Sequence, residues 1–246
     1  MEDYRPETYG EKMASSYDDF ALMRVGELPD AAVDTLARLA AGGRALELGI
    51  GTGRVALPLA ARGVEVFGLD VSAPMVAKMR EKPGGDRIPV TMGDMVDVAV
   101  EGEFTLIFVV FNTFFVLLTQ EDQIACFRNV ASRLERGGCF LIDAFFPDVS
   151  RYDRNQRVDA LDVSVDGVVI SVAMHDRASQ RIDAANLTLG GDGIGVMPVA
   201  LRYVWPSELD LMARLAGMEL ESRWADWSGA PFTSSSDRHI SVYRKP

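Results

Sequence analysis

Short apolar runs alternate with segments of helical spacing through the first 145 residues of the chain. The apolar runs are rich in branched and aromatic side chains, as buried strands are, and they lie at 44–48, 64–69, 88–92, 104–111 and 139–144. The segments of helical spacing lie between them, at 54–61, 72–82 and 121–134. Strands that alternate with helices of these lengths predict an α/β fold with a doubly wound, mostly parallel sheet.

Both flanks of this core have patterns of their own. Residues 11–20 and 30–41 have helical spacing and precede the first strand. Strand-like alternation after Phe146 predicts antiparallel hairpins, then a helix and two closing strands, at 158–172, 181–189, 201–205, 207–216, 219–224 and 239–243. We expect a seven-stranded sheet in one domain, 1–246, with four parts: covering helices at 1–43, an α/β core at 44–145, an antiparallel β insert that forms a lid at 150–205, and a C-terminal helix and strands at 206–246.

The first strand leads into glycines at every second position, Gly49, Gly51 and Gly53, with a helix beginning near Arg54. Glycine lets the backbone turn sharply and approach a ligand closely, because no Cβ intrudes. The helix behind the turn offers free N–H groups to a polar or anionic group. A turn of this kind, at the carboxyl end of a first strand, is where an open α/β sheet holds a nucleoside cofactor.

The acids around this turn distinguish between nucleoside cofactors. A dinucleotide-binding turn reads G-x-G-x-x-G, with its acidic partner about 20 residues further on. Here the spacing is G-x-G-x-G, and Glu47 lies two residues before the first glycine. The next strand ends in Asp70, whose carboxylate can accept hydrogen bonds from both hydroxyls of a ribose. This combination resembles the class I S-adenosylmethionine-dependent methyltransferases, whose first motif is an acid followed by G-x-G-x-G.

The resemblance implies a Rossmann-like methyltransferase fold and a set of residues for S-adenosylmethionine. The glycines would border the methionine part, Glu47 would lie below it, and Asp70 would take the ribose hydroxyls. Asp94, just after the third strand, would accept a hydrogen bond from the adenine amino group, or it is only a turn residue. The cofactor-binding candidates are Glu47, Gly49, Gly51, Gly53, Asp70, Val71, Asp94, Met95 and Phe111.

Tyrosines near the N-terminus and the two histidines are the candidate catalytic groups. The segment around Tyr17 is similar to the Tyr-Asp segment that covers the cofactor in many small-molecule methyltransferases, and Tyr9 is the second choice. His239 and His175 are natural bases near neutral pH, although a lone histidine is more often a packing residue. Residues at the expected mouth of the sheet and in the insert are candidates for the substrate site: Asn112, Phe114, Phe115, Asp143, His175 and Arg202.

Composition limits the partners of the protein. A formal net charge of −11 argues against a nucleic-acid substrate, because such binding needs a Lys/Arg surface. No apolar run is long enough to span a membrane, and the charged N-terminus lacks a signal core, so we expect a cytoplasmic protein. Cys126 and Cys139 are expected to be reduced thiols in the core. No zinc-ligand spacing is present, and we expect no metal.

The sequence therefore favours methyl transfer from S-adenosylmethionine to a small molecule, by in-line displacement in a water-poor pocket. The overall pattern resembles the N-methyltransferases of natural-product pathways, such as antibiotic-tailoring and amino-sugar enzymes, which implies an amine acceptor. O-methylation stays open, because residue spacing alone does not separate nitrogen from oxygen. A nucleotide-dependent oxidoreductase, a non-catalytic cofactor-binding module and a homo-oligomer also stay open at this point.

Overall fold

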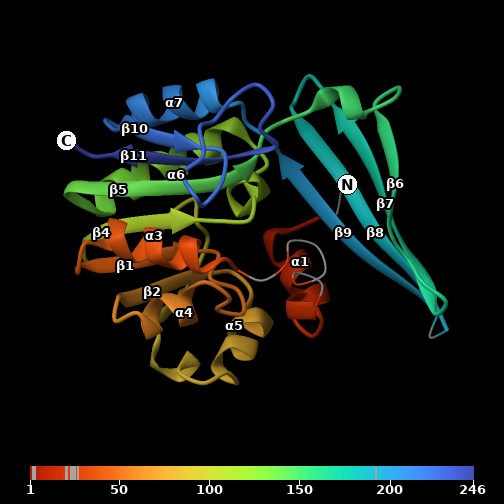
Figure 1. The fold of residues 1–246 in the computed structure, drawn as a ribbon, viewed down its shortest axis with the longest axis horizontal. Coiled ribbons are helices and arrows are strands. Elements are labelled where there is room, and N and C mark those ends of the chain that lie inside the picture. The colour runs from red at the N-terminus through yellow and green to blue at the C-terminus, as the bar shows by residue number, and fades with distance from the viewer. Residues whose placement is uncertain (2–3, 20–21, 23–25, 27, 192) are drawn as a thin grey trace.

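The computed structural model describes residues 1, 4–19, 22, 26, 28–191 and 193–246. The central strands of the described chain are β1 (Arg44–Leu48), β2 (Glu65–Asp70), β3 (Val90–Met92), β4 (Phe104–Val109), β5 (Leu134–Phe145), β10 (Glu219–Trp224) and β11 (Arg238–Arg244). They form a seven-stranded sheet in the order β10-β11-β5-β4-β1-β2-β3 (Figure 1). All neighbours pair in parallel except β11, which is antiparallel to both β5 and β10. The predicted seven-stranded, mostly parallel sheet is confirmed.

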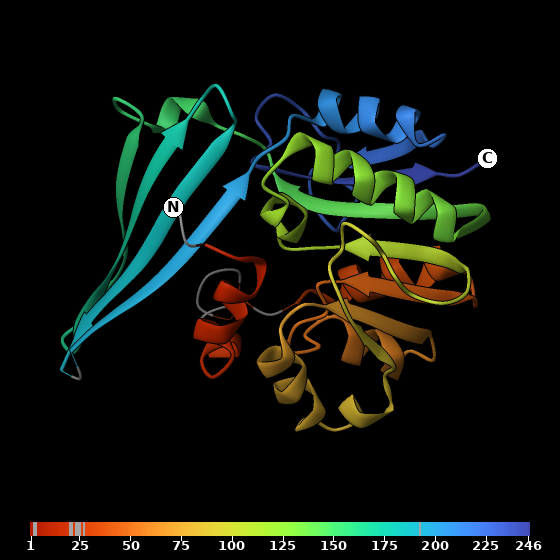
Figure 2. The ribbon, with the colours of Figure 1, turned by 180° about the vertical axis from the view of Figure 1, so that it is seen from behind.

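Helices cover both faces of this sheet: α3 (Asp30–Ala40), α4 (Ala56–Ala61) and α5 (Ala73–Arg80) on one, α6 (Gln120–Arg133) and α7 (Pro206–Leu215) on the other (Figures 1 and 2). The two faces follow from alternation along each strand. In β1, Ala45 packs with α3 and α4, whereas Leu46 and Leu48 pack with α6 and α7. Short 3₁₀ turns complete the described structure, η1 (Gly85–Arg87), η2 (Thr113–Val116) and η3 (Val149–Arg151).

Most predicted boundaries agree with the structure to within a few residues. Ser72 caps α5 as expected, because its Oγ accepts a hydrogen bond from Met75 N at 3.4 Å. Within the α/β core a larger shift occurs at β5, which begins at Leu134 although the sequence predicts a start at Cys139. Gly137 adopts a positive φ of 78°, and the pairing of β5 with β4 shifts register there. The sequence suggests that Gly137 and Gly138 precede the strand, whereas in the structure they lie within it. Cys126 and Cys139 are buried and unpaired.

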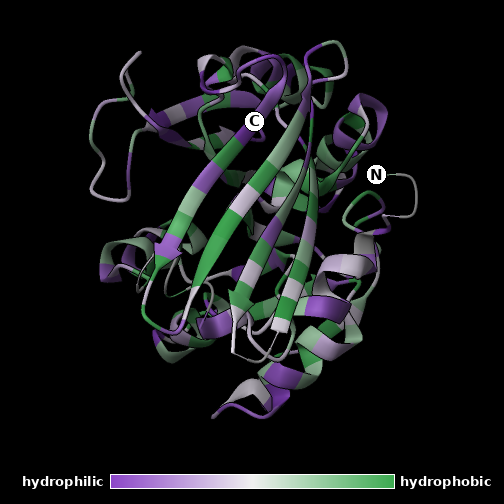
Figure 3. Cartoon of the chain, turned by 90° about the vertical axis from the view of Figure 1, so that its right-hand side faces the viewer, coloured by the Kyte–Doolittle hydropathy of each residue, from purple (hydrophilic) through white to green (hydrophobic). Residues whose placement is uncertain are grey.

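The insert is a separate antiparallel sheet in the order β6-β7-β8-β9, with β6 (Gln156–Val163), β7 (Gly167–Asp176), β8 (Arg181–Gly190) and β9 (Gly193–Arg202). It stands beside the main sheet, and Figure 3 views it from its outer side. The prediction of a strand at 201–205 was wrong, because β9 ends where that strand was expected to begin. The sequence pattern does not predict β9, because Gly195 and Pro198 are residue types that normally argue against a strand. Proline is tolerated there because β9 is an edge strand that pairs only with β8.

The N-terminal helix α1 (Pro6–Met13) lies between the main sheet and the insert (Figures 1 and 2). A helix over 11–20 was predicted, and this boundary was wrong. Proline occupies the first turn and starts the helix earlier, while a turn at 14–16 separates α1 from the helical residues 17–19. Phe20 lies outside the described residues. No helix among the described residues is long and apolar enough to cross a membrane.

Candidate active site

A cavity of about 360 Å³ lies where the carboxyl ends of β1, β2 and β4 face α1 and the insert. The loops after these strands form its floor, because the carboxyl ends of parallel strands share one edge of the sheet. Side chains of β8 and β9 form the opposite wall. The lining includes Tyr9, Tyr17, Glu47, Gly49, Gly51, Asp70, Val71, Asp94, Met95, Phe111 and Asn112. The structure therefore gathers most of the predicted cofactor-binding residues around one space.

The glycine turn is held in place by Asp70. Its Oδ2 accepts a hydrogen bond from Gly51 N at 2.7 Å, and its Oδ1 accepts one from Ser72 N at 2.7 Å. Gly49 and Gly51 have positive φ values of 72° and 54°, which favour glycine. A Cβ on Gly49 would lie 2.6 Å from Thr113 Cγ2, so the turn also needs glycine to pack against the loop after β4.

Glu47 is the buried acid beneath this turn. Its side chain lies at the end of β1, only 3% exposed, and its Oε2 has no hydrogen-bond partner among the described residues. Burial, with the nearby charge of Asp70, raises the pKa of Glu47 well above its ordinary value. An unpartnered carboxyl oxygen in such a place is suited to a positively charged or hydrogen-bond-donating ligand group.

The N-terminal segment closes one side of the cavity. Tyr9 and Tyr17 both line it, and their rings meet edge to face with centroids 6.2 Å apart. Burial is the main cause of the raised pKa of Tyr17, against the opposing effect of the Arg54 charge. Tyr17 therefore stays a neutral phenol at neutral pH. It can donate a hydrogen bond, but it cannot serve as a phenolate base.

Comparison with known proteins gives a match over nearly the whole chain. The CcbJ methyltransferase from Streptomyces caelestis is 38% identical, and the match covers 98% of this chain and 99% of that one with a TM-score of 0.91. A family profile described as a methyltransferase domain matches residues 45–138. The chain belongs to the S-adenosylmethionine-dependent methyltransferases. The family predicted from the glycine turn and its acids is confirmed.

Two further matches extend the comparison. A cypemycin N-terminal methyltransferase from a Streptomyces species is 28% identical over 205 residues, which cover 83% of this methyltransferase and 84% of that protein. CalS10, an amino pentose methyltransferase from Micromonospora echinaspora, was solved with S-adenosylmethionine bound. It is 22% identical, and the match covers 94% and 96% of the two chains with a TM-score of 0.69, a likeness that shows the shared fold. Both the enzyme class and the cofactor predicted from the sequence are confirmed.

The cavity of the methyltransferase fits its cofactor. The unpartnered oxygen of Glu47 can take a positive group, and the backbone of Gly49 and Gly51 lines the cavity beside it. Asp94 lines the cavity, and its Oδ1 also accepts a hydrogen bond from Val96 N at 2.8 Å, as the turn alternative predicts. When bound, S-adenosylmethionine supplies a methyl group on a positively charged sulfur. The assignment of individual residues to its parts stays a prediction.

Gly53 is not part of the cavity lining. It has a positive φ of 74°, and a Cβ there would lie 2.5 Å from Met79 Cγ. Its role is to let the glycine turn pack against α5. Of the three predicted glycines, Gly49 and Gly51 line the cavity and Gly53 does not, and contact of Gly49 and Gly51 with the cofactor stays a prediction.

Phe114 and Phe115 also lie outside the cavity of the methyltransferase. Both are fully buried, because the turn η2 directs them into the core. The Phe114 ring packs edge to face with those of Phe127 and Phe140, and the Phe115 ring packs with that of Phe145. Their placement corrects the substrate-site prediction in favour of the packing alternative. Asn112 does line the cavity, while its Oδ1 accepts a hydrogen bond from Phe145 N at 2.7 Å.

Asp143 and His239 lie beneath the site rather than in it. Asp143 forms an ion pair with Arg238, and its Oδ2 accepts a hydrogen bond from Phe111 N at 3.3 Å. This contact holds the loop after β4 from below. His239 is fully buried, its Nδ1 lies 2.9 Å from Ser241 Oγ, and burial lowers its pKa to about 3. The low pKa makes this histidine a weak base, and it does not line the cavity, so its position favours the packing alternative.

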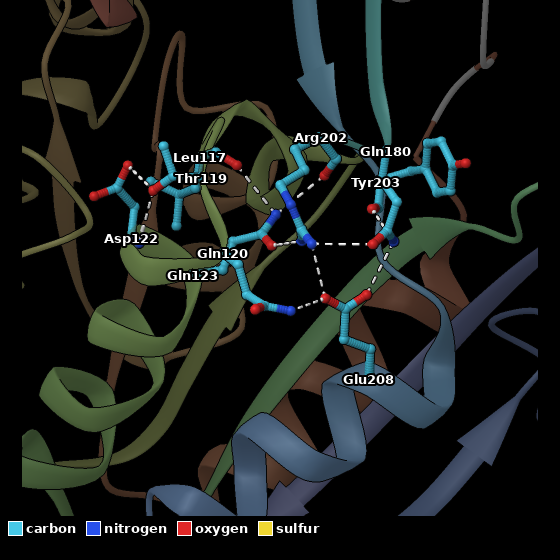
Figure 4. Close-up of polar contacts among 9 residues, drawn as sticks. All are labelled: Leu117, Thr119, Gln120, Asp122, Gln123, Gln180, Arg202, Tyr203 and Glu208. Atoms are coloured by element: carbon cyan, nitrogen blue, oxygen red, sulfur yellow. Dashed lines mark hydrogen bonds and ion pairs between the residues drawn. The ribbon is translucent and has the colours of Figure 1, made fainter. Parts of the chain in front are cut away.

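His175 and Arg202 belong to the anchoring of the insert. His175 Nε2 lies 3.0 Å from Tyr203 Oη, and the imidazole packs against the ring of Tyr152. Arg202 is 6% exposed and lies in the polar network shown in Figure 4. Its guanidinium is 2.8 Å from Glu208 and also donates to Gln123 and Gln180. The Arg202 contacts join β9 to α6 and α7, and the His175 contacts join β7 to Tyr152 and Tyr203. Neither residue lines the cavity, so their positions favour a structural role over substrate contact.

Several residues that line the cavity are not predicted by the sequence pattern, above all those of the insert wall. The wall is formed by Asn186 on β8 and by Met197, Val199 and Leu201 on β9. Because β9 was not recognised as a strand, its inward positions were not recognised either. Tyr4, Arg54 and Thr113 also line the cavity, and the Arg54 guanidinium lies 4.5 Å from the centre of the Phe111 ring.

Proposed function

We propose that this methyltransferase methylates an amine nitrogen of a small natural product or amino sugar. The observation that carries the proposal is the kind of side chain around the cavity. Among the described residues that line it, there is no histidine and no lysine. A hydroxyl acceptor usually needs a base, whereas an amine can react once it arrives neutral. A site without a conventional base near neutral pH is suited to an amine.

The acidic residues that line the cavity are not well suited to act as the general base for a hydroxyl acceptor. Both carboxylate oxygens of Asp70 already accept backbone hydrogen bonds. Glu47 is buried beneath the glycine turn, at the cofactor end of the cavity rather than against the insert wall. Tyr17 stays protonated, because burial raises its pKa. We assign Tyr17, supported by Tyr9, to orienting the acceptor and excluding water, which are the contributions that an in-line displacement needs.

The insert wall suggests what the acceptor looks like. Met197, Val199 and Leu201 present apolar surface to the cavity, and Asn186 is the polar side chain among them. An amide can donate and accept hydrogen bonds. We infer an acceptor with a largely apolar body and a hydrogen-bonding group that reaches Asn186. The prediction is that Asn186→Leu raises the KM of the acceptor by about tenfold, the worth of one buried hydrogen bond, and leaves the affinity for S-adenosylmethionine unchanged.

The relatives support the direction of this proposal. The 28% identical cypemycin enzyme is named as an N-terminal methyltransferase, and this name indicates an amine acceptor. The name of the CcbJ enzyme does not state which acceptor it methylates. CalS10 is named for an amino pentose, and KedS8 from Streptoalloteichus is named as a sugar N-methyltransferase. The acidic charge of the chain argues against a nucleic-acid acceptor, which agrees with a small-molecule substrate.

The test uses methyl-labelled S-adenosylmethionine and an extract of the source organism. We expect label in the small-molecule fraction, and mass spectrometry of the product then distinguishes N-methyl from O-methyl. The same acceptor with its amine replaced by hydroxyl is the matched control and should not react. For the amine, kcat/KM should rise with pH and follow the pKa of the acceptor itself. Label in protein or nucleic acid, or methylation of the hydroxyl analogue, contradicts the proposal.

A further inference from the structure

A second cavity lies at the end of the insert that joins the main body of the protein. Its volume is about 90 Å³, several times the roughly 10–15 Å³ that one water molecule needs. The turn η3, the turn at 153–156 and the end of β7 surround it, at the upper end of the insert in Figure 1. None of its lining residues lines the cofactor cavity: Val149, Tyr152, Arg154, Asn155, His175 and Arg177. Methyl transfer therefore leaves this pocket unexplained.

His175 brings an unpartnered polar atom to the second pocket. Its side chain is 4% exposed, and its Nε2 lies 3.0 Å from Tyr203 Oη. Its Nδ1 is buried and has no hydrogen-bond partner among the described residues. Burial, with the charge of Arg177, lowers the pKa of His175, so the imidazole is neutral near pH 7 and carries one N–H. A buried polar atom in this state needs a partner from outside the chain.

The contact with Tyr203 indicates what kind of partner His175 needs. Burial raises the pKa of Tyr203, so its phenol keeps its proton and can donate a hydrogen bond to His175 Nε2. With Tyr203 as the donor, the single N–H of the neutral imidazole lies on Nδ1. His175 Nδ1 is then a donor without an acceptor, and an oxygen atom of a ligand in the pocket is suited to accept its hydrogen bond.

Two arginines give the second pocket a positive lining. Arg154 and Arg177 are exposed, and neither forms an ion pair with any described residue. No acidic residue is part of the described lining. Asp176, the neighbour of Arg177 in the sequence, instead accepts hydrogen bonds from Ala178 N at 2.9 Å and from Ser179 Oγ at 2.8 Å. Both guanidinium groups therefore keep their donors for an anion.

The backbone holds Arg154 and Asn155 in an uncommon conformation. Their φ values are positive, 47° and 65°. They are the central residues of a tight turn in which Asp153 and Gln156 exchange backbone hydrogen bonds of 3.0 and 2.9 Å. His175 N donates a further hydrogen bond to Asn155 O at 2.8 Å, which ties this turn to the end of β7. Asparagine tolerates a positive φ, but arginine rarely adopts one, and backbone strain of this kind collects at ligand-binding positions.

We propose that the second pocket binds a phosphate group, either as free inorganic phosphate or as a phosphate monoester. The guanidinium groups of Arg154 and Arg177 match the charge of about −1.5 to −2 that a phosphate monoester carries near pH 7. A carboxylate would leave one of the two positive charges uncompensated. Asn155 and His175 add donors from other sides, which suits tetrahedrally arranged oxygens better than a planar carboxylate. The ring of Tyr152 leaves one apolar side for the carbon of a monoester.

The first experiment titrates the full chain with sodium phosphate by calorimetry at low ionic strength, with S-adenosylhomocysteine present to fill the other cavity. We expect a Kd below about 1 mM, and no binding heat from sodium chloride at the same ionic strength. Arg154→Gln and Arg177→Gln should each weaken binding by at least about tenfold, because each removes charge-assisted hydrogen bonds. Arg128→Gln is the matched control, since Arg128 is exposed on α6 and outside the pocket, and it should leave the affinity unchanged.

A second measurement locates the ligand in the wild-type chain, so it does not depend on the folding of an arginine variant. The chain has two histidines, and each gives its own imidazole signals in a protein with nitrogen-15-labelled histidine. Phosphate should shift the signals of His175, which lines the pocket, and leave those of His239 in place, which lies beneath the main site. Loss of one set of signals in His175→Gln assigns the two sets.

A comparison of ligands identifies the source of the phosphate group. Tighter binding of phenyl phosphate than of inorganic phosphate indicates a monoester, the reverse order indicates the free ion, and either order supports the pocket. Acetate that binds as tightly as phosphate overturns the assignment to phosphate. The proposal is also overturned if phosphate at about 10 mM gives no binding heat, if it binds both arginine variants as tightly as the wild type, or if it leaves the His175 signals unmoved.

Discussion

Asp18 and Thr52 join the N-terminal segment to the glycine turn through a hydrogen bond of 2.6 Å, which Thr52 Oγ1 donates to Asp18 Oδ1. Lys82 reinforces the contact, because its Nζ lies 2.6 Å from Asp18 Oδ2 and donates to the backbone oxygen of Thr52 at 2.9 Å. The three residues form a latch beside the cavity. Through this latch the segment that carries Tyr17 is fixed to the glycine turn that lines the cavity.

Asp18→Ala should therefore weaken retention of S-adenosylmethionine. The latch is partly exposed, so water screens it and we expect a two- to fivefold loss of affinity, about 0.5–1 kcal/mol. Burial acts to raise the pKa of Asp18, but hydrogen bonds from Lys82 and Thr52 outweigh it and the pKa is lowered. The latch is thus complete above the ordinary carboxyl pKa and is lost as pH falls through the lowered value. Calorimetry measures the affinity, and Asp19→Ala should match the wild type.

Glu47 gives the cofactor affinity a pH dependence. Burial raises its pKa in the free enzyme, and a positive ligand group would stabilise the charged form and lower the pKa again. Binding should then release a proton, and affinity should rise as pH rises through the raised pKa. The proton release is measured by calorimetry in buffers of different ionisation enthalpy. Glu47→Gln should bind less tightly and release fewer protons, whereas equal release in both proteins contradicts the assignment.

The same residue affects stability in the opposite direction. A carboxyl whose pKa is higher in the folded than in the unfolded state makes the folded enzyme less stable as pH rises through that interval. Without ligand, thermal unfolding of the wild type should show this loss as pH rises from the ordinary carboxyl pKa through the raised value. Glu47→Gln carries no such charge, so its melting temperature should change less over that interval.

The parts of the site that the sequence predicts are those fixed by local backbone geometry. The glycine turn and Asp70 depend on residues close in sequence or on neighbouring strands, and their pattern was sufficient. Phe114 and Phe115 were misplaced because the turn η2 determines which way a side chain points, and composition does not reveal that turn. The strand β9 was missed because Pro198 normally argues against a strand. Its tolerance depends on the edge position, which is a property of the whole sheet.

Tyr17→Phe should lower turnover more than it lowers cofactor affinity. The substitution removes a hydroxyl at the cavity while keeping the ring that packs against Tyr9. We expect kcat to fall about five- to tenfold, the worth of one hydrogen bond, with the Kd of S-adenosylmethionine changed less than twofold. Single-turnover kinetics and calorimetry separate the two effects. Tyr152→Phe, in the insert and outside this cavity, is the control. Equal losses in kcat and affinity would instead make Tyr17 a cofactor clamp.

Arg202 should contribute to stability and leave chemistry largely untouched. Its guanidinium lies 2.8 Å from Glu208, and both side chains are mostly buried between β9, α6 and α7 (Figure 4). Removing one partner of a buried ion pair costs about 3–5 kcal/mol, because the other charge is left uncompensated. Glu208 also accepts hydrogen bonds from Gln120 and Gln180, so we expect the lower end of that range for Arg202→Ala. The melting temperature should fall by about 6–12 °C for a chain of this size.

The pH dependence of this loss identifies its cause. Burial acts to raise the pKa of Glu208, but hydrogen bonds from Gln180, Arg202 and Gln120 lower it overall. A lowered carboxyl pKa contributes stability above the ordinary pKa, and that contribution disappears as pH falls through the folded value. The difference in melting temperature between wild type and Arg202→Ala should therefore shrink in acid. The double variant Arg202→Ala, Glu208→Ala should recover part of the loss at neutral pH, because it removes the uncompensated carboxylate. A constant difference across pH, with no recovery in the double variant, would mean that Arg202 acts through packing of its aliphatic stem rather than through charge.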